Sequence, residues 1–359
     1  MISSQLERDL QHTYASLSAA ERQKLSGNTI LITGSAGFIG FYLTNFFHRF
    51  RAELSLKKII CLDNFMLGRP AWQKDFDGDE HFIFKKFDII RDGVEDIPET
   101  AEADFVIHMA SIASPTFYRL HPLETLDANI WGLRRLFDFY RDKKLAGFLF
   151  FSSSEIYGDP QPEYVPTDEE YNGNVSCTGS RSCYDEAKRF GETLCKYFAQ
   201  VYDMPIGVAR PFNNYGPGMK IDDKRVPADF AKNVLEGKDI TILSSGAPKR
   251  TFCYIADAVA GYLKILLHGR YDYFNIGIDK PEISIAKLAE IYKSAGEELF
   301  DYRGKVKYAI SDDKNYLTNN PQRRCPKLDK ARRILHYEPT IFVEEGVRRF
   351  LTYLKEANS

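Results

Sequence analysis

A tyrosine and a lysine that could act together on a hydroxyl group lie four positions apart, at Tyr184 and Lys188. They fall in the segment 183–202, whose apolar residues recur at helical spacing, so we expect both side chains on one helix face. An ammonium beside a phenol favours the phenolate and lowers the tyrosine pKa from its ordinary value of about 10. The pair therefore indicates a general base that works near neutral pH, although the same spacing also occurs on ordinary helices.

The stretch FFSSSEIYGDP (150–160) ends an apolar run in hydroxyl groups and one carboxylate. The run predicts a buried strand, and open α/β sheets bind ligands at the carboxyl ends of their strands. The hydroxyl groups of Ser153 and Ser154 and the carboxylate of Glu155 would then lie at the ligand-binding edge of the sheet. The alternative for Glu155 is that it caps a turn.

The segment TGSAGFIG (33–40) places glycines at positions 34, 37 and 40, between a predicted strand and a predicted helix. In that context Gly34 permits a tight turn, Gly37 a close approach to a pyrophosphate, and Gly40 close packing of the helix. The helix N-terminus would supply free N–H groups for the anion. The motif predicts a dinucleotide site, with a plain strand-to-helix turn as the alternative.

Two aspartates end the next predicted strands. Asp63 can accept both ribose hydroxyls of an adenosine, and its charge would repel a 2′-phosphate, so NAD is favoured over NADP. Asp88 could meet the adenine or simply cap the following turn, and the sequence favours neither.

Short apolar runs alternate with longer amphipathic segments from residue 28 to residue 211. Strands are predicted over 28–33, 57–63, 81–88, 103–110, 146–152 and 205–211, with helices over 37–50, 122–142 and 183–202. Continuous apolar strands separated by helices indicate a doubly wound α/β fold with a parallel sheet, the Rossmann class. We expect a helical extension over 1–27, a cofactor domain over 28–211 and a smaller α/β substrate lobe over 212–359.

Composition argues against several other classes. The net charge of −2 and the pI near 6.4 give no basic surplus for nucleic acid, and the basic run 323–333 is interpreted as a solvated helix face. The six cysteines form no C-x-x-C pair and no histidine cluster has zinc spacing, so we expect no metal and reduced thiols in the cytoplasm. No secretion signal is visible, and no run approaches the ~20 apolar residues of a membrane span.

The motifs, in their order, resemble those of the extended short-chain dehydrogenases that modify nucleotide sugars. The resemblance covers nearly everything after residue 28, and its segments are TGSAGFIG (33–40), LDN (62–64), HMAS (108–111), SSSEIYG (152–158), YDEAK (184–188), RPFNNYGP (210–217) and KRTFCYIAD (249–257). It implies a nucleotide-sugar substrate, NAD as cofactor, and a catalytic triad of Ser153, Tyr184 and Lys188.

Further site residues come from the same resemblance. The residues expected to contact the cofactor are Gly34, Gly37, Phe38, Ile39, Gly40, Asp63, Asn64, Asp88, Ile89, Met109, Ala110, Ser111, Tyr184 and Lys188. The substrate contacts that it implies are Tyr118, Asn213, Arg225 and Arg250. The alternatives are a turn at Asn213 and surface charges at the two arginines.

The residues that follow Ser153 distinguish the reactions of this family. Sugar 4,6-dehydratases carry Asp-Glu there, and Ser154-Glu155 lacks the acid, so dehydration is disfavoured. Ser-Glu resembles the UDP-glucuronate decarboxylases, which oxidise C4, lose the carboxylate as CO₂ and reduce C4 again. Arg324 in RRCP (323–326) matches the arginine which that subfamily uses at the sugar carboxylate; its alternative is a surface pair with Asp312 or Asp313.

Other functions stay open. A 4-epimerase, or another enzyme that oxidises C4 of a different sugar, is the main alternative, and an inactive cofactor-binding scaffold is a further one. Pro248 replaces a glutamine usual in the related decarboxylases, Leu243 replaces an aromatic residue, and Gly179-Ser180 replaces Gly-Pro. The first two changes bear on the nucleotide pocket.

A homodimer is expected by analogy with the family, through a bundle that includes the helix of Tyr184 and Lys188. The apolar spacing of the preceding helix permits this contact and equally permits burial within one subunit. The residues concerned are Leu133, Leu136, Phe137 and Tyr140.

Overall fold

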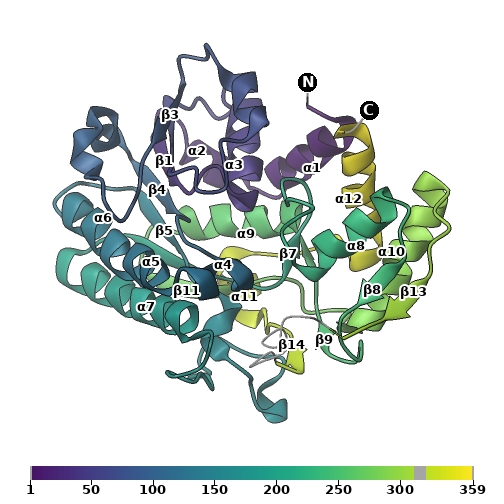
Figure 1. Cartoon of the computed structure of the whole chain (residues 1–359). Coiled ribbons are helices and arrows are strands. Elements are labelled where there is room, and N and C mark those ends of the chain that lie inside the picture. The colour runs from purple at the N-terminus through teal and green to yellow at the C-terminus, as the bar shows by residue number, and fades with distance from the viewer. Residues whose placement is uncertain (1, 311–320, 358–359) are drawn as a thin grey trace.

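The computed structural model describes residues 2–310 and 321–357 and has a seven-stranded parallel sheet at its centre (Figure 1). The strands lie in the order β11-β6-β5-β4-β1-β2-β3. Their bounds are β1 (Thr29–Thr33), β2 (Lys58–Asp63), β3 (Phe82–Lys86), β4 (Phe105–His108), β5 (Gly147–Phe151), β6 (Ile206–Pro211) and β11 (Asp272–Ile276). The doubly wound fold class is confirmed, and six of the strands lie within the ranges that the sequence predicts.

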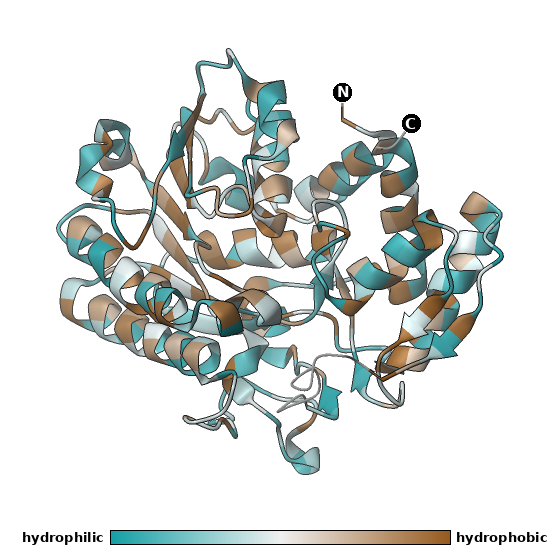
Figure 2. Cartoon of the chain, in the orientation of Figure 1, coloured by the Kyte–Doolittle hydropathy of each residue, from teal (hydrophilic) through white to brown (hydrophobic). Residues whose placement is uncertain are grey.

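Each face of the sheet is buried under helices, which explains the continuous apolar strands. Ile30 and Ile32 of β1 point into one core with α3 (Phe38–Arg49) and α9 (Ile255–Leu266). Leu31 points to the opposite side, into a core with α6 (Leu133–Tyr140) and α7 (Ser182–Tyr202). Figure 2 shows the apolar residues concentrated on the strands and on the helix faces that meet them.

Helix α6 is only part of the segment expected over 122–142. It follows α5 (Pro122–Asp127) and one π-helical turn, Ala128–Gly132. A shorter helix, α4 (Pro115–Leu120), precedes α5. Leu133, Leu136, Phe137 and Tyr140 are fully buried in the core of the chain. Burial within one subunit is therefore the correct interpretation of their spacing.

The chain after residue 211 builds a smaller region beside the carboxyl edge of the sheet. Its strands are β7 (Asn214–Tyr215), β8 (Ile240–Ile242), β9 (Lys249–Arg250), β10 (Cys253–Tyr254), β12 (Ile283–Ser284), β13 (Val306–Tyr308) and β14 (Arg323–Arg324). Its helices are α8 (Val226–Leu235), α10 (Ile285–Phe300), α11 (Asp329–Leu335) and α12 (Val343–Ala357). Between them α9 and β11 return to the large sheet. The division into domains at residue 211 stays a prediction. Within the second predicted domain, α9 packs on the large sheet and β11 is one of its strands.

Two helices precede β1, as expected for the segment 1–27. They are α1 (Ser4–Ala15) and α2 (Ala19–Gln23). The capping box at the start of α2 is present, because Ser18 accepts from the Glu21 amide and Glu21 accepts from the Ser18 amide. Helix α1 packs against α9 and α12, so the first and last helices of the chain lie side by side (Figure 1).

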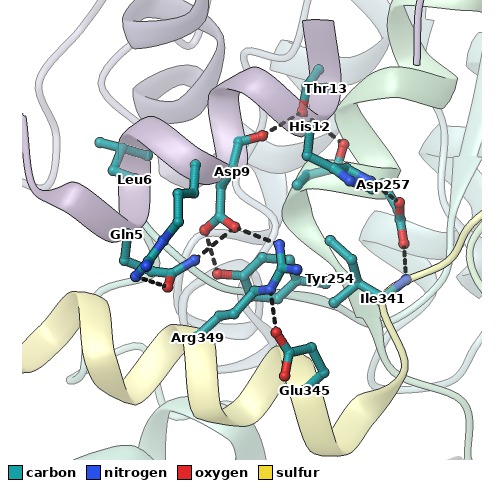
Figure 3. Close-up of polar contacts among 12 residues, drawn as sticks. Gln5, Leu6, Asp9, His12, Thr13, Tyr254, Asp257, Ile341, Glu345 and Arg349 are labelled. Atoms are coloured by element: carbon teal, nitrogen blue, oxygen red, sulfur yellow. Dashed lines mark hydrogen bonds and ion pairs between the residues drawn. The ribbon is translucent and has the colours of Figure 1, made fainter. Parts of the chain in front are cut away.

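A buried carboxylate holds α1 in this position (Figure 3). Asp9 is 0% exposed and accepts from Tyr254 Oη at 2.6 Å, Gln5 Nε2 at 3.0 Å and Arg349 Nη1 at 3.1 Å. The exposed carboxylate of Glu345 binds the same guanidinium at 2.8 Å. A fully buried charge is tolerated only when such partners compensate for the lost water, so the cluster ties α1 to Tyr254 of β10, which directly precedes α9, and to α12.

We expect Asp9→Ala to lower the free energy of unfolding by about 3 kcal/mol, because it leaves Tyr254 and Arg349 without their buried acceptor. Glu345→Ala is the matched control: this carboxylate binds the same arginine but is 48% exposed, so its loss should cost less than about 1 kcal/mol. Chemical denaturation followed by circular dichroism measures both values. Equal losses in the two variants would contradict the stabilising role of the buried cluster.

Candidate active site

A cavity of about 1250 Å³ runs along the carboxyl edge of the sheet and continues between β5, α7 and β14. Its lining includes every residue that the sequence predicts for the site. These are Gly34, Gly37, Phe38, Ile39, Gly40, Asp63, Asn64, Asp88, Ile89, Met109, Ala110, Ser111, Tyr118, Ser153, Ser154, Glu155, Tyr184, Lys188, Asn213, Arg225, Arg250 and Arg324. A cavity for one small molecule measures about 300–1,000 Å³, so this one has room for two ligands side by side.

The glycine loop forms one end of the cavity. Gly34 has φ +75°, and a Cβ there would lie 2.8 Å from the Ala110 nitrogen, so both the turn and the close approach of β4 require glycine. A side chain at Gly40 would collide with the Ser35 carbonyl, so the first turn of α3 packs directly on the loop. Gly37 caps α3 without a side chain, which leaves the first amides of that helix directed at the cavity.

Asp63 joins this loop to the end of β2. Its Oδ2 accepts from the Ala36 amide at 3.0 Å and its Oδ1 from the Phe65 amide at 2.8 Å. Burial raises the pKa of Asp63, and the two amide contacts oppose that rise. Each carboxylate oxygen has a second lone pair, so the group can still accept ribose hydroxyls from the cavity.

Asp88 caps the turn after β3, since its Oδ1 accepts from the Ile90 amide at 3.0 Å. The capping interpretation is therefore confirmed, and the contact with adenine stays a prediction. The glycine cradle, the uncapped helix start and Asp63 together fit a dinucleotide.

Tyr184 and Ser153 lie together where β5 and α7 meet. Ser153 hydrogen-bonds the phenol, which lowers the pKa of Tyr184, but burial outweighs it and raises that pKa above its ordinary value. Lys188 Nζ donates to the Phe151 carbonyl at 2.7 Å and lies 5.6 Å from the centre of the Tyr184 ring. Burial lowers the pKa of Lys188 to about 7.

The prediction that Lys188 lowers the pKa of Tyr184 is therefore wrong for this geometry. Lys188 binds a backbone carbonyl instead of the phenol. The loss of water around the buried phenol has the largest effect on the pKa of Tyr184, and this effect raises it. The hydroxyl of Ser153, and then the charge of Arg181, oppose the effect of burial and favour release of the Tyr184 proton.

Glu155 lies between two arginines. Arg324 Nη2 donates to Glu155 Oε2 at 2.7 Å, and Arg324 Nη1 binds the other carboxylate oxygen, so the contact is bidentate. Arg181 Nη2 binds Oε2 as well. The exposed fractions of the side chains are 19% for Glu155, 11% for Arg181 and 7% for Arg324. Burial favours the neutral acid, but the two guanidinium groups outweigh it and hold the pKa of Glu155 well below its usual range.

Two alternatives from the sequence can now be compared with this cluster. The carboxylate of Glu155 binds arginines, and only its backbone takes part in the turn 154–158. Arg324 is buried and faces the cavity. Asp312 and Asp313, its possible surface partners, lie outside the described residues.

Arg181 and Asp185 belong to the site and were missed by sequence reasoning. Arg181 precedes α7, and its Nε lies 3.4 Å from Asp185 Oδ2 one turn further along. Burial and the charge of Glu155 raise the pKa of Asp185, and its Oδ1 has no hydrogen-bond partner. The sequence did contain one signal for Arg181. A cation at a helix N-terminus is unfavourable because of the helix dipole, so an arginine at that place indicates carboxylates nearby.

Arg250 lies directly beside Arg324, because β9 and β14 pair in parallel with these two residues in register. Burial, followed by the charge of Arg324, lowers the pKa of Arg250 to about 10. Two adjacent guanidinium groups in a cavity favour an anionic ligand.

The other predicted substrate residues line the cavity around these arginines. The Tyr118 ring stacks on Tyr184 at 5.1 Å between centres, and its buried hydroxyl has no partner. Asn213 Nδ2 donates to the Thr251 carbonyl at 2.9 Å, and Arg225 pairs with Asp223. Arg250 is buried and is thus not a surface charge, whereas the side chain of Arg225 is 39% exposed and keeps both interpretations.

The fold and the cavity define a dinucleotide-dependent enzyme of the Rossmann class with a second, anion-binding compartment. Comparison with known proteins identifies the family. Residues 30–277 match the model described as "NAD dependent epimerase/dehydratase family". The chain belongs to this family, and NAD is its cofactor.

Two curated relatives and one solved structure show the degree of similarity. The chain is 33% identical to UDP-glucuronic acid decarboxylase 1 of Xenopus tropicalis over 327 residues, which cover 91% of this chain and 72% of that protein. It is 34% identical to UDP-glucuronic acid decarboxylase 6 of Arabidopsis thaliana over 322 residues, 90% of this chain and 87% of that protein. The crystal structure of a UDP-glucose 4-epimerase from Thermotoga maritima superposes with a TM-score of 0.80 at 23% identity, covering 92% and 100% of the two chains.

We expect Asp63→Asn to weaken NAD binding about tenfold and to leave NADP binding unchanged or stronger, because it removes the negative charge that repels a 2′-phosphate. The substitution keeps one oxygen for the loop amides. Calorimetric titration of the cofactor-free protein gives both dissociation constants. Asp88→Asn serves as the control and should leave the NAD-to-NADP ratio unchanged; the same ratio in Asp63→Asn and the original protein would contradict the role of Asp63.

Proposed function

We propose that the protein decarboxylates a nucleotide-linked uronic acid, converting UDP-glucuronate into UDP-xylose and CO₂. The observation that carries this proposal is the bidentate pair of Arg324 with a carboxylate inside the cavity, next to Tyr184 and the register-paired Arg250. A guanidinium that binds one buried carboxylate is suited to bind that of a substrate. The curated decarboxylases that the chain resembles support the same assignment.

Bound NAD supplies the reversible removal of a hydride from the sugar at C4. The residues of this chain then have separate tasks. Tyr184 accepts the proton of the 4-hydroxyl, with Ser153 hydrogen-bonded at the same oxygen. Arg324 stabilises the negative charge that develops when the carboxyl group leaves, and Ser154 and Glu155 deliver a proton to C5. Arg250, Arg225, Asn213 and Tyr118 bind the rest of the nucleotide sugar.

The alternative is a 4-epimerase or another enzyme that oxidises C4. The likeness of fold to the UDP-glucose 4-epimerase favours it, since such an enzyme also needs Tyr184 and Lys188. It has no use for a buried arginine that binds a carboxylate bidentately, and for this reason decarboxylation is preferred. A 4,6-dehydratase is disfavoured by Ser154, which cannot act as a carboxylic acid.

Incubation with UDP-glucuronate and NAD should release CO₂ and form UDP-xylose, which nuclear magnetic resonance distinguishes from the substrate and its 4-epimer. Arg324→Gln should reduce CO₂ release by at least about a hundredfold, because a charge-stabilising donor is worth about 2.7–4 kcal/mol in such sites. The control is Arg323→Gln, since the neighbouring Arg323 binds Glu282 instead. A 4-epimer formed without CO₂ would establish the alternative.

We also propose a homodimer. Its contact is the exposed apolar surface of α5, the π-helical turn and α7, where five large side chains are between 47% and 69% exposed. They are Leu123, Trp131, Phe190, Tyr197 and Val201. Helices α5 and α7 pack side by side (Figure 1), so these exposed side chains lie on neighbouring elements, and a second copy of the chain would cover them.

Trp131→Glu should convert the dimer into a monomer, since it places a charge in the centre of this apolar contact. Sedimentation velocity at several protein concentrations measures the state. Phe342→Glu alters an exposed phenylalanine beside α12 and should leave the dimer intact. A Trp131→Glu protein that sediments as the original does would rule out this contact.

A cytoplasmic location is proposed on the basis of the cysteines, all six of which are free thiols. None of the helices within 2–310 and 321–357 is long and apolar enough to span a membrane.

A further inference from the structure

The cluster around Glu155 is electrically balanced before any ligand enters. Two carboxylates, Glu155 and Asp185, face two guanidinium groups, Arg181 and Arg324, and all four side chains are at least four-fifths buried. Arg181 contacts both carboxylates, whereas Arg324 binds Glu155 alone. With both carboxylates ionised the formal charges sum to zero, as a poorly hydrated site requires. Burial and then the charge of Glu155 raise the pKa of Asp185 to about 7, so near neutral pH the ligand-free cluster already holds part of a proton.

A substrate carboxylate disturbs this balance. Arg324 presents its guanidinium fork to Glu155, and two carboxylates cannot occupy the same fork. If the substrate takes the fork, Glu155 and Asp185 remain with Arg181 as their only direct cationic partner. Two neighbouring carboxylates that share one cation in a buried site cannot both stay ionised, and the free energy is lowered when one of them is protonated.

The other groups around the cluster do not remove this constraint. Tyr184 of α7 and Tyr118 of α4 face Glu155 with neutral, buried hydroxyls. Arg250 of β9 is the remaining nearby cation, and it is placed beside Arg324 in the anion-binding compartment. The unpartnered Oδ1 of Asp185 shows that this carboxylate is less fully hydrogen-bonded than Glu155.

We propose that the substrate carboxylate displaces Glu155 from Arg324, and that Glu155 and Asp185, held together by Arg181, then take up one proton from solution and store it for the reaction. This inference rests on the proposed function, since it takes the ligand to carry a carboxylate. Arg181 and Asp185 thereby gain a role: they are positioning residues that determine the protonation of Glu155.

The proton balance of decarboxylation agrees with this exchange. The bond between C5 and the carboxyl carbon breaks, CO₂ leaves, and the electron pair left on the sugar is finally joined by one proton at C5. The reaction thus consumes one proton for each carboxylate lost. The proton taken up on binding is that proton, and after its transfer Glu155 is again a carboxylate that pairs with Arg324.

Calorimetry can count the protons without turnover. The protein is the NAD-loaded Tyr184→Phe variant, which binds ligand but lacks the base for the 4-hydroxyl. UDP-glucuronate and UDP-glucose, which lacks the carboxylate, are titrated at pH 7 in two buffers of different ionisation enthalpy. We expect binding of UDP-glucuronate to take up more protons per site than binding of UDP-glucose, with a difference of about half a proton to one proton, because Asp185 is already partly protonated at pH 7. Its affinity, relative to that of UDP-glucose, should fall up to about tenfold per pH unit as the stored proton is lost at high pH.

Three further variants in the same background locate the proton. In Glu155→Gln and in Asp185→Asn one carboxylate is left for Arg181, so the extra uptake should disappear in both. Glu186→Gln is the matched control, because Glu186 is the next residue on α7 and pairs with Arg189 at the surface. It should keep the full difference between the two ligands.

The outcomes separate this inference from the proposed function. Equal proton uptake for both ligands, or an uptake that survives in Glu155→Gln and Asp185→Asn, overturns the exchange even if the original enzyme releases CO₂. Failure of UDP-glucuronate to bind overturns the exchange together with the proposed function.

Discussion

The contact of Glu155 with Arg181 and Arg324 is the interaction on which the arrangement of the site depends. The three side chains come from the end of β5, the start of α7 and the short strand β14, which are far apart in the sequence. Burial makes a lone charge costly at any of these positions, so each one requires the others. The ion pairs therefore fix the sheet side of the cavity against the smaller region that faces it.

The sheet supplies the second constraint, because its parallel strands bring their carboxyl ends to one edge. The glycine loop, Asp63 and the β5 serines reach the cavity in this way, and none of them needs a long loop. The return of α9 and β11 to the sheet places residues from both regions in a single apolar core. Helix α1, held by Asp9, packs on α9 and α12 (Figure 3). The first and last helices of the described chain thus pack against a helix that itself packs on the sheet.

The elements and most site residues could be predicted from the sequence, because strand ends in a parallel sheet have a fixed relation to one another. The direction of the Tyr184 pKa could not, since it depends on burial and on Lys188 finding the Phe151 carbonyl. Arg181 and Asp185 were missed because their partner Glu155 is about thirty residues away in the sequence. The apolar spacing of Leu133 and Phe137 fits burial within one subunit as well as a dimer contact, and periodicity alone cannot separate the two. The exposed apolar side chains of α5 and α7 could be recognised only from the structure.

The parallel pairing of β9 with β14 has a consequence for how ligands arrive. Because Arg250 and Arg324 are in register, two cationic groups face the same narrow compartment from adjacent strands. Glu155 balances the charge of Arg324, so Arg250 supplies the net positive charge of this compartment, and mobile ions weaken its field over about 8–10 Å at physiological ionic strength. The rate at which a multiply charged nucleotide is captured should therefore vary with added salt, and simple inorganic anions should compete for the compartment.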